Sequence, residues 1–60
     1  MTAETILYII LSLLRADNAT GLDKPVVHQH LVEVSQAIEA HATKSVPAER
    51  LISLAYNESR

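Results

Sequence analysis

The chain has 60 residues and a formal net charge of −2, which arises from five Lys and Arg residues against seven Asp and Glu residues. Its basic residues are scattered instead of clustered, and this excludes the electrostatic footprint of a nucleic-acid-binding protein. The single glycine leaves no phosphate-cradling loop, and the lack of cysteine excludes a disulfide framework and a thiolate nucleophile.

The expected organisation is one helical unit over residues 1–60, of the all-α class, with three helices. A chain of this size buries only about 60% of the surface of its unfolded form, so its stability is marginal without more apolar cover. We therefore expect the remainder of a domain, or another helical surface, to cover its apolar faces.

The first helix is predicted over residues 3–17, with Thr2 as its N-cap. The segment from Ile6 to Leu14 is strongly apolar, but it is too short to span a bilayer and no Lys or Arg precedes it. Neither a membrane span nor a signal peptide is predicted. On a helical projection apolar residues cover most of the surface, which predicts a buried helix. The remaining arc holds Glu4, Tyr8, Ser12 and Arg15.

A loop at residues 17–21 leads to the second predicted helix, residues 24–43. Asp23 is its expected N-cap, and Pro25 is tolerated in its first turn. Apolar residues recur in this helix at spacings of four, three and four, a period that needs an apolar partner surface. These residues are Val27, Leu31, Val34 and Ile38.

Three histidines raise the question of a metal site. His28 and His30 are two residues apart, which separates them by about 200° on a helix. His30 and His41 share a face, but eleven residues of helix place them roughly 16 Å apart. Since no cysteine or suitably spaced acid completes a ligand set, we expect no metal and no cofactor, and we interpret the histidines as packing or hydrogen-bonding side chains.

The third helix is predicted over residues 47–59, with Pro47 in its first turn. With Leu51 taken as zero and about 100° per residue, Leu54 and Ala55 fall within roughly 60° of it, and Glu58 lands in the same apolar arc. A carboxylate on an apolar stripe is either an accident of a fraying helix end or a side chain kept out of water for chemistry.

The segment from residue 45 to residue 60 resembles the opening of the soluble lytic transglycosylase domain, a relative of goose-type lysozyme. In that family a Leu-rich helix ends in Glu-Ser-Gly or Glu-Ser-Arg. Lys44 and Ser45 stand where the family has an aromatic residue and a glycine. The resemblance covers about residues 31–60, and the matching positions are Val46, Pro47, Leu51, Ile52, Leu54, Ala55, Tyr56, Glu58 and Ser59.

The resemblance implies a peptidoglycan lytic transglycosylase, which cleaves the β-1,4 bond between N-acetylmuramic acid and N-acetylglucosamine to give a 1,6-anhydro product. Glu58 would be the lone general acid and base, a departure from the usual two-carboxylate scheme. Desolvation against Leu51, Leu54 and Ala55 would favour the protonated acid that this role requires. Ser59 would help to order the site, and Tyr56 could contribute to a sugar subsite.

The same resemblance implies that the chain is the amino-terminal part of an incomplete lysozyme-like domain, because the family's glycan-binding segments follow the Glu-Ser motif. The partner would be a peptidoglycan glycan strand, located in the cell wall, the periplasm or a phage particle. We expect the isolated chain to be inactive. The alternative interpretation is a small non-catalytic three-helix interaction or dimerisation module, in which Glu58 is only a terminal residue.

Overall fold

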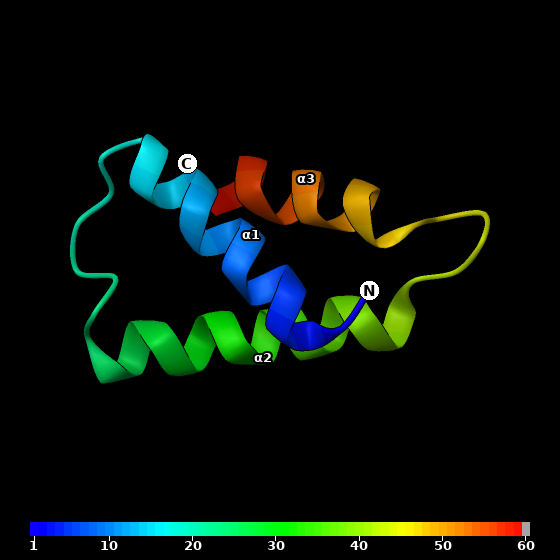
Figure 1. Ribbon diagram of the computed structural model, residues 1–60, viewed down its shortest axis with the longest axis horizontal. Coiled ribbons are helices and arrows are strands. Elements are labelled where there is room, and N and C mark those ends of the chain that lie inside the picture. Colours follow the sequence, from blue (N-terminus) through cyan, green and yellow to red (C-terminus); the bar gives the residue numbers. More distant parts are fainter. Residues whose placement is uncertain (60) are drawn as a thin grey trace.

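Three helices make up the computed structural model of the chain (Figure 1). Helix α1 spans Ala3–Ala16, α2 spans Pro25–His41 and α3 spans Ala48–Ser59. The structure describes residues 1–59, and the side chains of residues 1–58. No strand occurs in this described part, which confirms the all-α, three-helix prediction.

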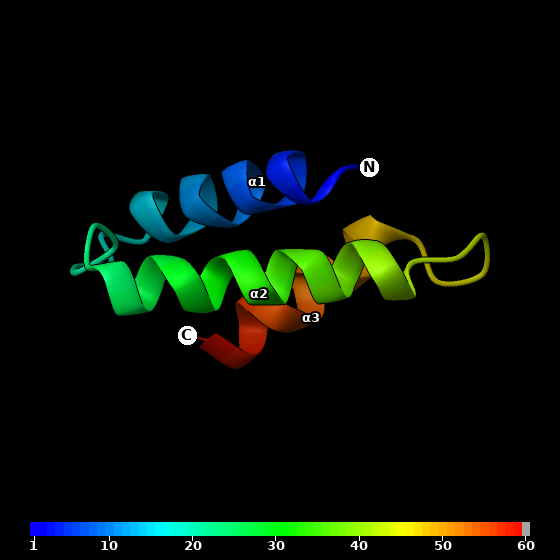
Figure 2. The same ribbon diagram turned by 90° about the horizontal axis from the view of Figure 1, so that it is seen from below.

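The three helices follow one another up, down and up. Figure 1 shows α2 running back alongside α1, and α3 returning in the opposite direction to α2. In the view of Figure 2, α1 lies along one side of α2 and α3 crosses behind α2, and each of the three helices contacts the other two. The molecule is elongated, with extents of 33 × 19 × 16 Å. Short connections therefore join antiparallel neighbours, as in other small helical bundles.

Both ends of α1 are capped by local hydrogen bonds. The backbone N–H of Thr5 donates to Thr2 Oγ1 over 3.2 Å, so Thr2 is the N-cap that the sequence predicts. At the other end, Asn18 adopts a left-handed backbone with φ of 61°. The N–H groups of Asn18 and Ala19 donate to the carbonyls of Arg15 and Leu14, the two bonds of a Schellman motif.

Helix α2 begins at Pro25, and its N-cap is Lys24 instead of the expected Asp23. Lys24 has extended backbone angles and makes no side-chain cap bond. The proline explains the shift, because its ring disfavours a helical conformation for the residue before it. The expected Asp23 cap is therefore wrong, and helix α2 starts one residue later than predicted.

Helix α2 ends at His41, two residues before the predicted boundary. Thr43 is drawn into the following turn, where its N–H donates to the Val46 carbonyl and its hydroxyl accepts from the Val46 N–H, at 2.9 and 3.0 Å. A threonine side chain that bonds to nearby backbone competes with helix continuation in this way. The turn then positions the start of α3.

One apolar core joins all three helices. Ile6 is fully buried, and the only buried polar side chain of the described residues, Ser35, is 1% exposed. Its hydroxyl donates to the Leu31 carbonyl over 2.8 Å, so this polar group costs little to bury. The buried apolar residues of the core are Ile6, Ile10, Leu31, Ile38, Ala48 and Ile52.

Helix α1 is less buried than the sequence predicts. Only Ile6 and Ile10 of its residues are buried. The prediction of a buried helix is wrong because two neighbouring helices cover only one side of α1, while its apolar residues extend around most of its circumference. Its other apolar aliphatic residues from Leu7 onward touch the core and remain partly exposed; they are Leu7, Ile9, Leu11, Leu13 and Leu14.

Candidate functional site

Glu58 lies in the last turn of α3, and its side chain is exposed. The sequence places this carboxylate on an apolar arc with Leu51 and Leu54. That arc exists in the structure, but it faces outward, since Leu54 is 57% exposed and Leu51 is half-buried. The expectation that apolar neighbours shelter Glu58 from water is therefore wrong within the described residues.

Glu58 is exposed because the inward side of α3 is centred on Ile52 and not on Leu51. Leu51 and Ile52 are adjacent and both apolar, so the helix has two possible inward directions about 100° apart. Packing selects the direction of Ile52, which is 4% exposed, together with Ala48 at 5%. Leu51 therefore lies on the side of the helix, about 100° from the inward direction of Ile52. Glu58 lies slightly farther round, about 120° from Ile52.

Tyr56 is half-buried and connects α3 to the end of α1. Its hydroxyl donates a hydrogen bond to the carboxylate of Asp17, the C-cap residue of α1. A bond to an ionised acceptor is stronger than a neutral one. The structure thus gives Tyr56 a role in joining two helices, whereas its contribution to a sugar subsite stays a prediction.

Ser59, predicted to order the catalytic site, belongs to α3, but its side chain lies outside the described part of the chain. The structure brings Tyr56 and Glu58 onto the last two turns of one helix. The carboxylate side chain of Glu58 is exposed. A single solvated carboxylate can accept hydrogen bonds, but it lacks the desolvated surroundings that a general acid needs near neutral pH.

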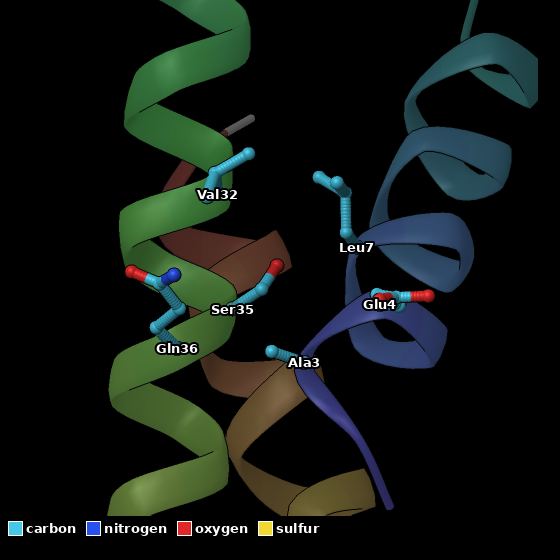
Figure 3. Close-up of a pocket in the computed structure, with 6 residues that line it drawn as sticks. All are labelled: Ala3, Glu4, Leu7, Val32, Ser35 and Gln36. Atoms are coloured by element: carbon cyan, nitrogen blue, oxygen red, sulfur yellow. The ribbon is translucent and has the colours of Figure 1, made fainter.

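A hollow lies elsewhere in the molecule, between the first half of α1 and the middle of α2 (Figure 3). Its volume is about 160 Å³. Figure 3 shows Leu7 and Val32 facing one another across it, while the polar ends of Glu4 and Gln36 point away. The hollow is therefore an apolar depression beside α1, with no α3 residue in its lining; the lining residues are Ala3, Glu4, Leu7, Val32, Ser35 and Gln36.

The outward side of α1 carries a row of four residues that we call the outer seam: Glu4, Tyr8, Leu11 and Arg15. Each lies within about 60° of the direction opposite the two buried isoleucines, and the exposed Ser12 lies on the same side. Tyr8 is 69% exposed, Leu11 is half-buried, and both charged residues are exposed. The sequence places Glu4, Tyr8 and Arg15 on one arc together with Ser12, and assigns Leu11 to the apolar remainder; the spacing of four, three and four is the signal that adds Leu11 to this row.

The three histidines, His28, His30 and His41, are all exposed. Among residues 1–59, no group of three or more His, Cys, Asp or Glu side chains is arranged to hold a metal ion. In the same part of the chain, none of the helices combines the length and the apolar character needed to cross a membrane.

A comparison with protein-family models, with curated proteins and with solved structures finds no match for this chain. The resemblance to the soluble lytic transglycosylase domain thus rests on the motif residues alone. The activity it implies stays a prediction.

Proposed function

We propose that this chain is a non-catalytic helical interaction module that presents the outer side of α1 to another protein surface. The observation that carries the proposal is the distribution of apolar residues on α1. Two isoleucines of this helix are buried in the core, five more aliphatic residues pack against the core while staying partly exposed, and Tyr8 is 69% exposed. Such an apolar surface on a small folded unit is typical of an association site.

The total surface area supports the same proposal. The chain exposes 4381 Å², whereas a compact monomer of its 6.6 kDa mass is expected to expose about 3,900 Å². The excess of roughly 500 Å² accompanies the elongated shape of the molecule and means that three short helices leave more surface in water than a compact monomer of this mass does. Association would therefore supply apolar burial that three short helices cannot provide alone.

Site-specific photo-crosslinking in cells that express the chain tests the proposal. A photoreactive amino acid at position 8 should give a discrete adduct, whereas the same group at the exposed position 44 should not. The adduct should diminish with Arg15→Glu, a change of an exposed residue on the same side of α1, and persist with Leu54→Lys, a change of an exposed leucine on α3. Equal adduct yields at positions 8 and 44, or no adduct at either, would contradict the proposal.

The transglycosylase activity is a second candidate function, and one observation favours it. Glu58 and two leucines form an outward stripe on α3, and a further surface laid over Leu51 and Leu54 would remove the carboxylate from water. Only such cover would give Glu58 the environment that a general acid requires. Without it, the exposed carboxylate argues for the non-catalytic module.

A further inference from the structure

The outer seam of α1 fits one particular partner. We propose that a second copy of this chain docks on the seam in antiparallel orientation, so that two α1 helices pair about a twofold axis. This inference rests on the proposed function and names the partner of the same surface. Two observations support this inference: the order of charged and apolar residues along the seam, and the exposure of these residues.

The seam is symmetric about its own centre. Its residues occupy positions 4, 8, 11 and 15. The pair 4 and 15 and the pair 8 and 11 have the same midpoint, which lies between Ile9 and Ile10. Reversing the direction of the helix about that point places position 4 on position 15 and position 8 on position 11. A surface that maps onto itself in this way satisfies the condition for a twofold, isologous interface.

The charges select the antiparallel orientation. In an antiparallel pair, Glu4 of one protomer lies opposite the partner's Arg15, and the opposite end repeats the contact. A parallel pair would place Glu4 against the partner's Glu4 and Arg15 against the partner's Arg15, which is repulsive at both ends. Both side chains are exposed in the monomer, so they are free to meet a partner at modest desolvation cost.

Between the charged ends, apolar residues face each other. Tyr8 of one protomer meets the partner's Leu11, and Leu11 meets the partner's Tyr8. The spacing of four, three and four is the spacing of core positions in a coiled coil, in which antiparallel helices pack at 8–10 Å. Tyr8 is 69% exposed in the single chain, so pairing removes its ring from water and leaves its hydroxyl at the edge.

The area available agrees with a weak dimer. If each protomer covers the roughly 500 Å² by which it exceeds a compact monomer, the total buried is on the order of 1,000 Å², near the lower limit for a specific interface. The dimer should therefore be reversible and dependent on concentration. The hollow between α1 and α2 lies beside the Glu4 end of the seam, and Glu4 belongs to both.

Analytical ultracentrifugation of the full chain, from micromolar to millimolar concentration, tests the inference. The unchanged chain should show a monomer–dimer equilibrium. Glu4→Lys alone and Arg15→Glu alone should each weaken dimerisation by at least about tenfold, because each change makes both ends of the pair repulsive. Leu54→Lys should leave the equilibrium unchanged. Circular dichroism should show the same helix content in every variant.

Mixing the two charge-reversed chains provides the sharpest readout. One Glu4→Lys chain and one Arg15→Glu chain restore opposite charges at both ends, so the equimolar mixture should form a heterodimer about as strong as the original homodimer. A mixture that stays monomeric, or single variants that dimerise normally, would overturn the antiparallel pairing. A monomeric unchanged chain whose position 8 still crosslinks to a different protein would overturn this inference alone, whereas loss of crosslinking as well would overturn the proposed function.

Discussion

The two sides of α1 both carry apolar residues, but these residues have opposite tasks. The inner side places Ile6 and Ile10 in the core, where they are 0% and 3% exposed. The outer side holds Tyr8 and Leu11 between two opposite charges, and Tyr8 is 69% exposed there. The difference teaches that an apolar helix residue contributes to folding or to association according to the side on which it lies, and that changes on the two sides should be separable by experiment.

The largest effect is expected on the inner side. Ile6→Ala removes a fully buried side chain and should destabilise the fold by about 2–5 kcal/mol. Because a 60-residue chain has a free energy of unfolding of only about 0.05–0.15 kcal/mol per residue, this variant should lose a large part of its stability and melt at a clearly lower temperature. Thermal unfolding followed by circular dichroism measures the loss. A variant that melts like the unchanged chain would show that Ile6 is not in the core.

A change on the outer side should affect dimerisation and leave the stability of the monomer nearly unchanged. Tyr8→Ala should change the free energy of unfolding of the monomer by no more than about 0.5 kcal/mol, as for other exposed positions. Its dimerisation should nevertheless weaken, since the ring supplies central apolar contact area. Unfolding measured at low concentration and sedimentation at high concentration separate the two quantities. A large stability loss at low concentration would assign Tyr8 to the fold instead.

The ends of α1 allow a finer test. Thr2→Ala removes the hydroxyl that accepts the Thr5 N–H and should cost about 1 kcal/mol, the usual loss for an N-cap. Thr2→Ser retains the acceptor and serves as the control. Because the cap holds the first turn, which carries Glu4, this variant should also weaken dimerisation slightly. Equal stability of the Ala and Ser variants in urea titrations would show that the cap bond contributes nothing.

Tyr56→Phe should have an effect of similar or smaller size. It removes the hydrogen bond from the Tyr56 hydroxyl to the Asp17 carboxylate while keeping the ring, and an exposed bond of this kind contributes roughly 0.5–1.5 kcal/mol. Asp17→Asn keeps an acceptor oxygen but not the charge, so its stability should lie between that of the unchanged chain and that of Tyr56→Phe. If Tyr56→Phe is as stable as the unchanged chain, α3 is held against α1 by apolar contacts alone.

The smallest effect on stability is expected at Glu58. Since the side chain is exposed, Glu58→Gln should change the free energy of unfolding by less than about 0.5 kcal/mol. The same variant tests the second candidate function. Release of anhydromuropeptides from peptidoglycan by any protein that contains this chain, abolished by Glu58→Gln with the fold intact, would support the transglycosylase and contradict the non-catalytic module.

The sequence was sufficient for much of the fold. The Thr2 cap, the loop after α1 and the inward residues Leu31 and Ile38 of α2 follow from local chemistry and a single apolar period. The start of α2 was misplaced by one residue, because the effect of Pro25 on Lys24 outweighs the capping preference of Asp23. Local rules of this kind act within a few residues and can be read without knowledge of the tertiary structure.

The candidate site was less predictable. In α3, Leu51 and Ile52 define two apolar directions, and only contact with the other helices decides that Ile52 points inward. The role predicted for Glu58 depended on that choice. In α1, apolar residues on almost every side concealed which of them form a surface, so the symmetry of the outer seam became meaningful only when Ile6 and Ile10 were known to point to the core.

The chain contains its own reporters for the central claim, that α1 associates through its outer seam. Its only aromatic residues are Tyr8 on the seam and Tyr56 beside Asp17. In proton NMR spectra recorded from micromolar to millimolar concentration, we expect the ring resonances of Tyr8 to shift progressively while those of Tyr56 stay in place. Tyr8 resonances that do not change over this range, or equal changes at both rings, would contradict the claim.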